Sequence, residues 1–281
     1  MDDAYRHCER LTREADKDRF LAGLFAPADR RGALFALHAF DIEISRVADA
    51  VRQPLAGELR LQWWRDVLAG ERGGEAQASP VAAALGDAIA RFALPVEPLL
   101  ALIEAHGFDL YEDPMPSLAH LEAYARRTVV APMRLAAQVL GAGPAAGIEP
   151  AGLALALTRL LRDVARHASR GRLYLPLDIL ERHGARGEDV LAGRATPELR
   201  AALADLRARA CDHLARFAQD VASLPAAAVP AVLPATLARL DLARMERAGY
   251  DPFRNPVEVP QWRRQWALWR AARRLTAQAR G

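Results

Sequence analysis

The amino-acid sequence predicts an all-α protein. Apolar residues recur at the three- and four-residue spacing of amphipathic helices along almost the whole chain. Runs that alternate β-branched and polar residues, which would indicate strands, are essentially missing. Gly- and Pro-rich stretches such as GERGGEAQASP, GAGPAAG and DPFRNP separate the apolar segments, as turns between helices do.

Helices are expected wherever the apolar spacing persists between two turn signals. In the segment GRLYLPLDIL we expect a structured connection instead, because Gly171 favours a helix C-terminus and Pro176 lacks an amide donor. No linker divides the chain, so residues 1–281 are expected to form one domain that ends in an amphipathic helix over 260–281. The expected helices cover 3–16, 31–51, 55–69, 80–93, 96–106, 118–139, 150–168, 196–222, 231–247 and 260–278.

Composition and charge argue against several classes of protein. The 281 residues are 52% hydrophobic without a run of eighteen apolar residues, so we expect a large core and no membrane-spanning helix. The charged N-terminus lacks the apolar segment of a secretory signal, which predicts a cytoplasmic protein. Cys8 and Cys211 have no metal-ligand spacing. A net charge of +3 without a nucleic-acid motif predicts no nucleic-acid partner.

Two helical segments carry the informative residues. They are FALHAFDIEISRVADAV at 35–51 and LTRLLRDVARHASRGRLYLP at 157–176. Patterns such as GxSxG, GxGxxG and HExxH are missing from the sequence, so hydrolase, dinucleotide and zinc-protease readings have no support.

These segments resemble the squalene/phytoene synthase family of head-to-head prenyl transferases. In that family an ALYAF-type helix carries a first Asp-rich motif, and a helix with LRD followed by GRxYLP carries the second. LRD at 161–163 and GRLYLP at 171–176 match the second signature, and LRLQWWRDVLAG at 59–70 and HLEAYARRT at 120–128 follow the family's order. The resemblance implies an isoprenoid synthase type helical bundle around a central cavity.

The resemblance also implies which positions would hold magnesium. The family's acidic residues stand one helical turn apart on facing helices and share Mg²⁺ ions that neutralise the substrate diphosphates. Here the first motif reads Ser45, Arg46 and Asp49, and the second keeps Asp163 but has His167, an imidazole that is a poor magnesium ligand. We therefore predict no metal site, and Asp49 and Asp163 are remnant acids without a catalytic role.

This pattern resembles most closely the branch that contains the mitochondrial assembly factor for respiratory complex I. That resemblance implies an accessory or assembly role with a protein partner of the respiratory chain, close to the inner membrane. Two alternatives stay open. One is an active prenyl transferase, for which Mg²⁺ would be the cofactor, and the other is a purely structural helical interaction module.

Arginines offer a replacement for the missing metal. On a continuous helix Arg159, Asp163, Arg166 and Arg170 fall on one face, with Arg46 opposite, so guanidinium groups could bind a prenyl diphosphate or a lipid headgroup directly. The competing interpretation is a solvated basic face, on which Asp49 and Asp163 pair with Arg46 and Arg166. The predicted ligand-binding residues are Arg46, Arg159, Arg166, Arg170, Arg172 and Tyr174.

The C-terminal helix carries an aromatic stripe formed by Trp262, Trp266 and Trp269 among several arginines. The favoured interpretation is that this stripe seals the protein's own core. The alternative is peripheral contact with a membrane, where tryptophan and arginine are both favourable.

Overall fold

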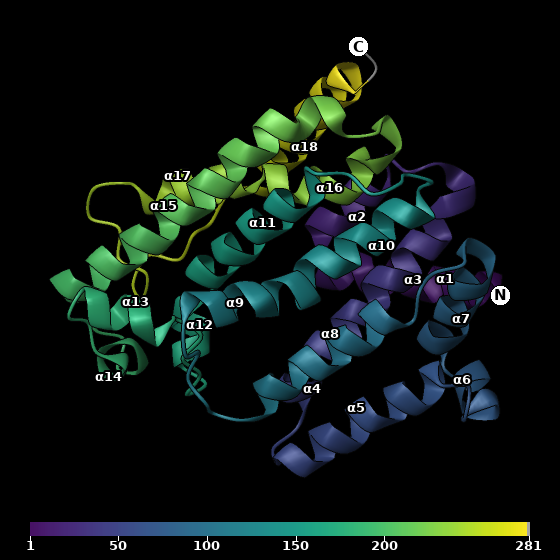
Figure 1. Cartoon of the computed structure of the whole chain (residues 1–281), viewed down its shortest axis with the longest axis horizontal. Coiled ribbons are helices and arrows are strands. Elements are labelled where there is room, and N and C mark those ends of the chain that lie inside the picture. The colour runs from purple at the N-terminus through teal and green to yellow at the C-terminus, as the bar shows by residue number, and fades with distance from the viewer. Residues whose placement is uncertain (280–281) are drawn as a thin grey trace.

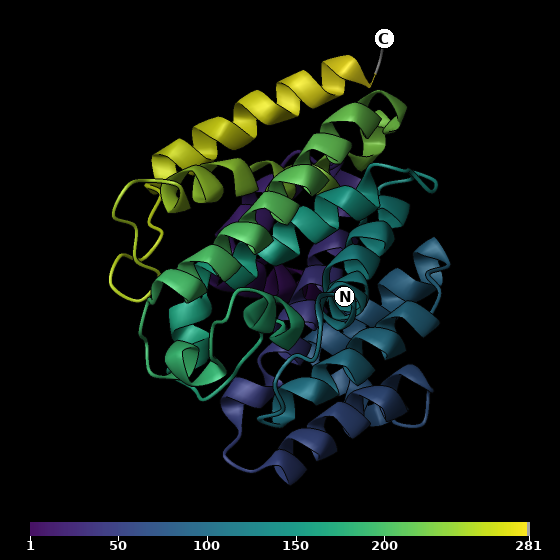
Figure 2. The same cartoon turned by 60° about the vertical axis from the view of Figure 1, so that its left-hand side comes forward.

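The computed structural model describes residues 1–279 and confirms the all-α prediction, with no strand in that range. Residues 280–281, the end of the expected C-terminal helix, lie outside the described residues. The helices form one bundle (Figures 1 and 2). They are α1 (Asp2–Ala15), α2 (Lys17–Gly23), α3 (Ala28–Ser45), α4 (Val47–Ala50), α5 (Pro54–Leu68), α6 (Gly73–Ala78), α7 (Pro80–Phe92), α8 (Glu97–Gly107), α9 (Leu118–Ala125), α10 (Ala131–Val139), α11 (Ile148–Arg162), α12 (Val164–Ala168), α13 (Leu177–Arg182), α14 (Gly187–Leu191), α15 (Pro197–Asp220), α16 (Val229–Thr236), α17 (Ala238–Met245) and α18 (Gln261–Gln278).

Two expected helices are interrupted at residues of the informative segments. The helix predicted over 31–51 breaks at Arg46, between α3 and α4, and the helix predicted over 150–168 breaks at Asp163, between α11 and α12. Asp163 leaves helical geometry, with φ −98° and ψ 10°. The short helices α2, α6, α13 and α14 were missed, because five to seven residues are too few to show a helical period.

Helix α11 lies at the centre of the bundle. It packs against α15, α16, α17 and a π-helical turn, Arg126–Val130, that joins α9 to α10 (Figure 1). Gly152 allows the close approach of α11 to this turn, because a Cβ atom at that position would lie 2.7 Å from Cγ2 of Val130. The inner positions of α11, from Ile148 to Leu161, are almost all buried. This packing fixes the helix that leads to Asp163.

The connection after α12 is structured, as the sequence predicted. Gly171 has a positive φ of 72°, the left-handed conformation that glycine adopts without strain. Two backbone hydrogen bonds then tie the segment to Met115, which donates to the carbonyl of Leu173 at 2.9 Å and accepts from Leu177 at 3.0 Å. Leu173 and Leu175 are buried. Tyr174, which lies between them, is therefore held in a fixed direction.

One segment, Ala226–Met245, is long and apolar enough to cross a membrane by length and composition alone. It contains α16 and α17, and 67% of its most apolar window is buried inside the bundle. Pro234 interrupts its hydrogen bonding. These features are those of a core segment of the bundle.

The favoured interpretation of the tryptophan stripe is wrong. Helix α18 lies along the outside of the bundle (Figure 2), and Trp262, Trp266 and Trp269 are 63%, 55% and 47% exposed. Leu268 and Leu275, on the opposite side of the helix, are buried instead. The helical period of apolar residues does not specify which of two apolar faces turns inward. In α18 the aliphatic face packs against the bundle.

Candidate functional site

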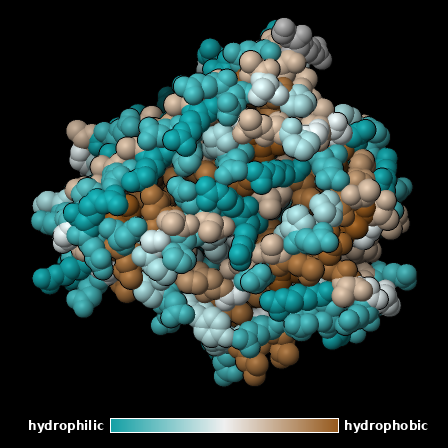
Figure 3. Space-filling model, in the orientation of Figure 1, coloured by the Kyte–Doolittle hydropathy of each residue, from teal (hydrophilic) through white to brown (hydrophobic). Residues whose placement is uncertain are grey.

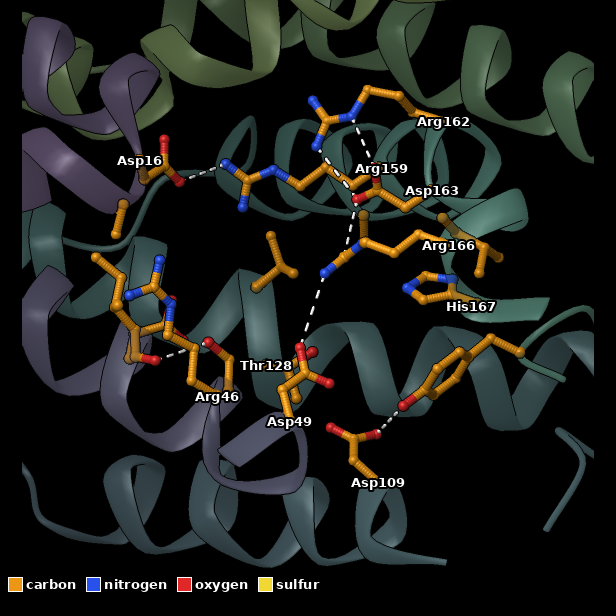
Figure 4. Close-up of a pocket in the computed structure, with 18 of the residues that line it drawn as sticks. Asp16, Arg46, Asp49, Asp109, Thr128, Arg159, Arg162, Asp163, Arg166 and His167 are labelled. Atoms are coloured by element: carbon orange, nitrogen blue, oxygen red, sulfur yellow. Dashed lines mark hydrogen bonds and ion pairs between the residues drawn. The ribbon is translucent and has the colours of Figure 1, made fainter. Parts of the chain in front are cut away.

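A cavity of about 630 Å³ lies between the two informative segments (Figure 4). Its walls come from the α1–α2 junction, the α3–α4 break, α9, α11, α12, the connection after α12 and the first turn of α18. The structure brings all the sequence-predicted positions to this one cavity. These are Ser45, Arg46, Asp49, Arg159, Asp163, Arg166, His167, Arg170, Arg172 and Tyr174.

Asp49 is surrounded by three arginines that follow α11 in the sequence. Arg170 forms an ion pair with Oδ2, Nη1 of Arg172 lies 3.1 Å from Oδ1, and Nη1 of Arg166 lies 3.8 Å from Oδ2. Arg172 also donates to the carbonyl of Ala48 at 3.0 Å. The carboxylate of the first segment is therefore neutralised by the second segment.

Asp163 is paired with the arginines on either side of it. Nε of Arg162 lies 3.2 Å from Oδ1, and Nη2 of Arg166 lies 3.3 Å from Oδ2. Burial raises the pKa of Asp163, but the charge of Arg162 and its hydrogen bond outweigh burial and hold that pKa below its ordinary value. Asp163 is therefore a charged partner for arginine.

Arg166 bridges Asp49 and Asp163. It contacts both Asp49 and Asp163, which belong to facing segments of the cavity (Figure 4). In the magnesium-dependent arrangement implied by the resemblance, a cation shared by facing carboxylates would perform this neutralisation. A fixed guanidinium stands there instead.

The ion pairs continue from Asp163 to the C-terminal helix. Arg162 lies 3.7 Å from Asp241. Arg264 of α18 lies 2.7 Å from Asp241 and also contacts Asp18 of α2. Asp241 is buried, so its charge needs these partners. We call this alternating series, Asp18–Arg264–Asp241–Arg162–Asp163–Arg166–Asp49, the ion-pair chain.

Arg159 lies elsewhere than predicted. Its Nη2 contacts Asp16 at 2.9 Å, at the α1–α2 junction, so it does not surround Asp163. The prediction assumed one continuous helix, whereas the helix is interrupted at Asp163, between Arg159 and the arginines that follow. Asp16 also accepts a hydrogen bond from the backbone of Arg19, and Arg19 forms a buried ion pair with Asp41. Arg170 lies beyond the end of α12 and contacts Asp49 for the same reason.

Tyr174 donates its hydroxyl to a buried carboxylate that the sequence did not single out. Asp109 accepts hydrogen bonds from Tyr174 at 2.7 Å and from Tyr124 at 2.8 Å, and it contacts Nδ1 of His106 at 2.6 Å. Burial raises the pKa of Asp109, but the hydrogen bond from His106 and the further partners lower that pKa overall. Tyr174 thus has a structural partner while its side chain lines the cavity.

His167 stands beside this cluster as a neutral base. Burial, followed by the charge of Arg166, lowers its pKa to about 4. Its Nδ1 is buried and has no hydrogen-bond partner within residues 1–279, and its ring packs edge-on against Tyr174 with centroids 4.8 Å apart. The imidazole therefore carries a buried nitrogen that is not hydrogen-bonded within residues 1–279.

The cavity is positively charged overall. Nine Lys or Arg and seven Asp or Glu residues line it, which leaves a formal charge of +2 with neutral histidines. Side chains of Arg166 and Arg170 remain about half exposed after pairing with the acids. Each guanidinium has five N–H donors, so donors remain available for an anion.

The donor set does not fit a magnesium site. Mg²⁺ prefers an octahedron of hard oxygen ligands, and the oxygens of Asp49 and Asp163 are contacted by guanidinium groups. Within residues 1–279 no group of three or more His, Cys, Asp or Glu side chains has the arrangement of a metal site. The geometry favours an anion at this place over a cation.

Comparison with known proteins gives the family. The family model described as squalene/phytoene synthase matches residues 12–270. The chain belongs to the squalene/phytoene synthase family. The all-α bundle is therefore the fold of a family.

Relatives within the squalene/phytoene synthase family differ in what they are reported to do. The chain is 29% identical over 259 residues to complex I assembly factor 6 of Rattus norvegicus, covering 91% of this chain and 78% of the relative. It is also 29% identical over 278 residues to a phytoene synthase of Thermus thermophilus, covering 96% and 93%. The squalene synthase HpnC of Alicyclobacillus acidocaldarius superposes with a TM-score of 0.75 at 27% identity, covering 89% and 96%.

Sequence reasoning missed the partners that are remote in sequence. Asp16 and Asp241 are separated from their arginines by long stretches of chain, and Asp109 by more than sixty residues from Tyr174. The only local signal was the interruption of helical spacing around Asp16 and Lys17, where α1 ends and α2 begins.

The pKa of His167 predicts an acid-dependent loss of stability. The folded-state pKa of about 4 lies below the ordinary 6.5, so the unfolded chain binds a proton that the folded chain excludes. The contribution to stability is present above pH 6.5 and is lost as pH falls towards 4. From pH 7 to pH 5 the free energy of unfolding should therefore fall by about 2 kcal/mol because of this side chain.

Urea unfolding at both pH values measures this loss, and His167→Gln should make it smaller. His120→Gln, which changes an exposed histidine, serves as the control and should keep the wild-type difference. An unchanged difference in His167→Gln would contradict the assignment of a buried, neutral imidazole.

Proposed function

We propose that this member of the squalene/phytoene synthase family is a non-catalytic accessory protein that acts in the assembly of respiratory complex I. We further propose that its cavity binds a phosphate-bearing lipid, such as a prenyl diphosphate, through arginines without magnesium. The observation that carries the proposal is the bridge of Arg166 between Asp49 and Asp163. A guanidinium there contacts both carboxylates, for which the resemblance would imply a shared metal ion.

The similarity to complex I assembly factor 6 supports the assembly role. This relative matches over most of the chain and is named as an assembly factor of complex I. The same chain matches a phytoene synthase at equal identity, so family membership alone does not separate the two functions. The chemistry of the cavity favours the accessory role.

Anion binding follows from the charge and geometry of the cavity. Arg166 and Arg170 face the same carboxylate and keep exposed N–H groups, and Arg172 is held beside them by Ala48. Charge-assisted hydrogen bonds from several guanidinium groups to one diphosphate are strong and directional. Asp49 and Asp163 orient the arginines in this arrangement.

Calorimetry with a short-chain prenyl diphosphate tests the binding. We expect binding that is unchanged by EDTA, and a loss of affinity of about tenfold or more in Arg166→Ala, because one charge-assisted contact is removed. Arg182→Ala is the control, since Arg182 is as exposed as Arg166 (51% and 52%) and pairs with an aspartate, Asp205, but lies outside the cavity. Binding that EDTA abolishes would contradict the proposal.

The same preparation distinguishes an accessory protein from a prenyl transferase. With Mg²⁺ and farnesyl diphosphate, we expect no condensed product above background. A clear magnesium-dependent product would favour the transferase, and absence of both binding and product would favour a purely structural module.

Deletion of the gene tests the assembly role in cells. We expect less assembled complex I on native gels, restored by the wild-type gene and by the Arg182→Ala control. Rescue by Arg166→Ala would show that assembly is independent of the cavity. Normal complex I together with the loss of an isoprenoid product would contradict the assembly role.

A further inference from the structure

The outer face of α18 is a surface that the bundle itself does not use. It consists of three exposed tryptophans and the exposed arginines beside them, and we call it the α18 outer face. The opposite side of the helix packs inward through Leu268, Ala271 and Leu275. The α18 outer face contains Trp262, Arg263, Trp266, Trp269, Arg270, Arg273 and Arg274.

Each tryptophan of this face is stacked with an arginine. The guanidinium carbon of Arg270 lies 4.4 Å from the ring centroid of Trp266, and the corresponding distances are 4.9 Å for Arg273 on Trp269 and 5.2 Å for Arg263 on Trp262. A stacked pair presents an apolar ring and a positive charge at the same place. Such a unit suits a boundary between hydrocarbon and anionic groups.

The charge of the helix is entirely of one sign. Residues 261–278 contain five arginines and no acidic residue. Among residues 1–279, only Arg264 of this helix has an acidic partner, because it turns inward to Asp18 and Asp241 in the ion-pair chain. The remaining positive charge faces outward together with the indole rings.

We propose that the α18 outer face docks the protein on an anionic lipid bilayer. Indole rings favour the level of the lipid headgroups, and arginines beside them are attracted to anionic headgroups. The positive charge of the face favours an anionic bilayer over a second copy of the chain, since two such arginine-rich faces would repel each other. Helix α18 then lies in the plane of the membrane surface.

The docked orientation places the cavity beside the bilayer. Gln261 and Arg264 of the first turn of α18 line the cavity, and Trp262 stands between them in the sequence on the outer face. A lipid that leaves the bilayer would therefore meet the ion-pair chain first at Arg264. This consequence rests on the proposed lipid binding, whereas the docking itself does not.

Vesicle sedimentation with the full chain tests the docking. Vesicles of phosphatidylcholine alone are compared with vesicles that contain about 30% phosphatidylglycerol. We expect the protein to bind the anionic vesicles at least about tenfold more tightly, and high salt to weaken that binding.

Matched variants test whether binding depends on the α18 outer face or on exposed apolar side chains in general. The triple variant Trp262→Ala, Trp266→Ala and Trp269→Ala should bind anionic vesicles about tenfold or more weakly. Its melting temperature should stay within about 2 °C of the wild type, because the rings are exposed. Leu55→Ala with Leu59→Ala, which removes exposed apolar side chains from α5 at the lower edge of Figures 1 and 3, should bind like the wild type.

A charge-matched pair completes the experiment. Arg270→Gln with Arg273→Gln should weaken binding to anionic vesicles, whereas Arg52→Gln with Arg60→Gln removes the same charge from another exposed region and should not. Three results would overturn the docking: no preference for anionic vesicles, equal binding by the tryptophan variant, or a wild-type dimer in light scattering that this variant converts to monomer.

Discussion

The ion-pair chain is the interaction on which the cavity depends. Seven charged side chains alternate from Asp18 to Asp49, and they join α2, α18, α17, α11, α12 and α4 across one space. A partly buried charge that loses a partner is costly, so removal of one member weakens the neutralisation of its neighbours. The walls of the cavity are therefore coupled to one another by electrostatics as well as by packing.

This coupling gives the squalene/phytoene synthase fold a different electrostatic basis. Where the resemblance implies facing carboxylates that share metal ions, Asp49 and Asp163 are joined by Arg166. A metal ion would be an exchangeable ligand, whereas a guanidinium is a permanent part of the chain. A permanent cation suits retention of an anionic lipid better than turnover, and this is the physical basis of the proposed accessory role.

The sequence predicted which residues line the cavity better than it predicted the ion pairs between them. The fold class followed from helical spacing along the chain, and the predicted positions that line the cavity followed from the two informative segments, because both are local patterns. The breaks at Arg46 and Asp163 could not be predicted, since helical spacing continues through both. The pairing of Arg159 with Asp16 joins residues more than 140 positions apart, so only the tertiary structure reveals it. The orientation of α18 was mistaken because aromatic and aliphatic stripes share one period.

A crystal structure of the protein with a non-hydrolysable farnesyl diphosphate analogue and Mn²⁺ would test the central claim most directly, because anomalous scattering locates manganese independently of the ligand. The account predicts diphosphate oxygens within hydrogen-bond distance of Arg166 and Arg170, with no manganese peak in the cavity. A manganese peak between Asp49 and Asp163, with Arg166 displaced from both, would contradict it.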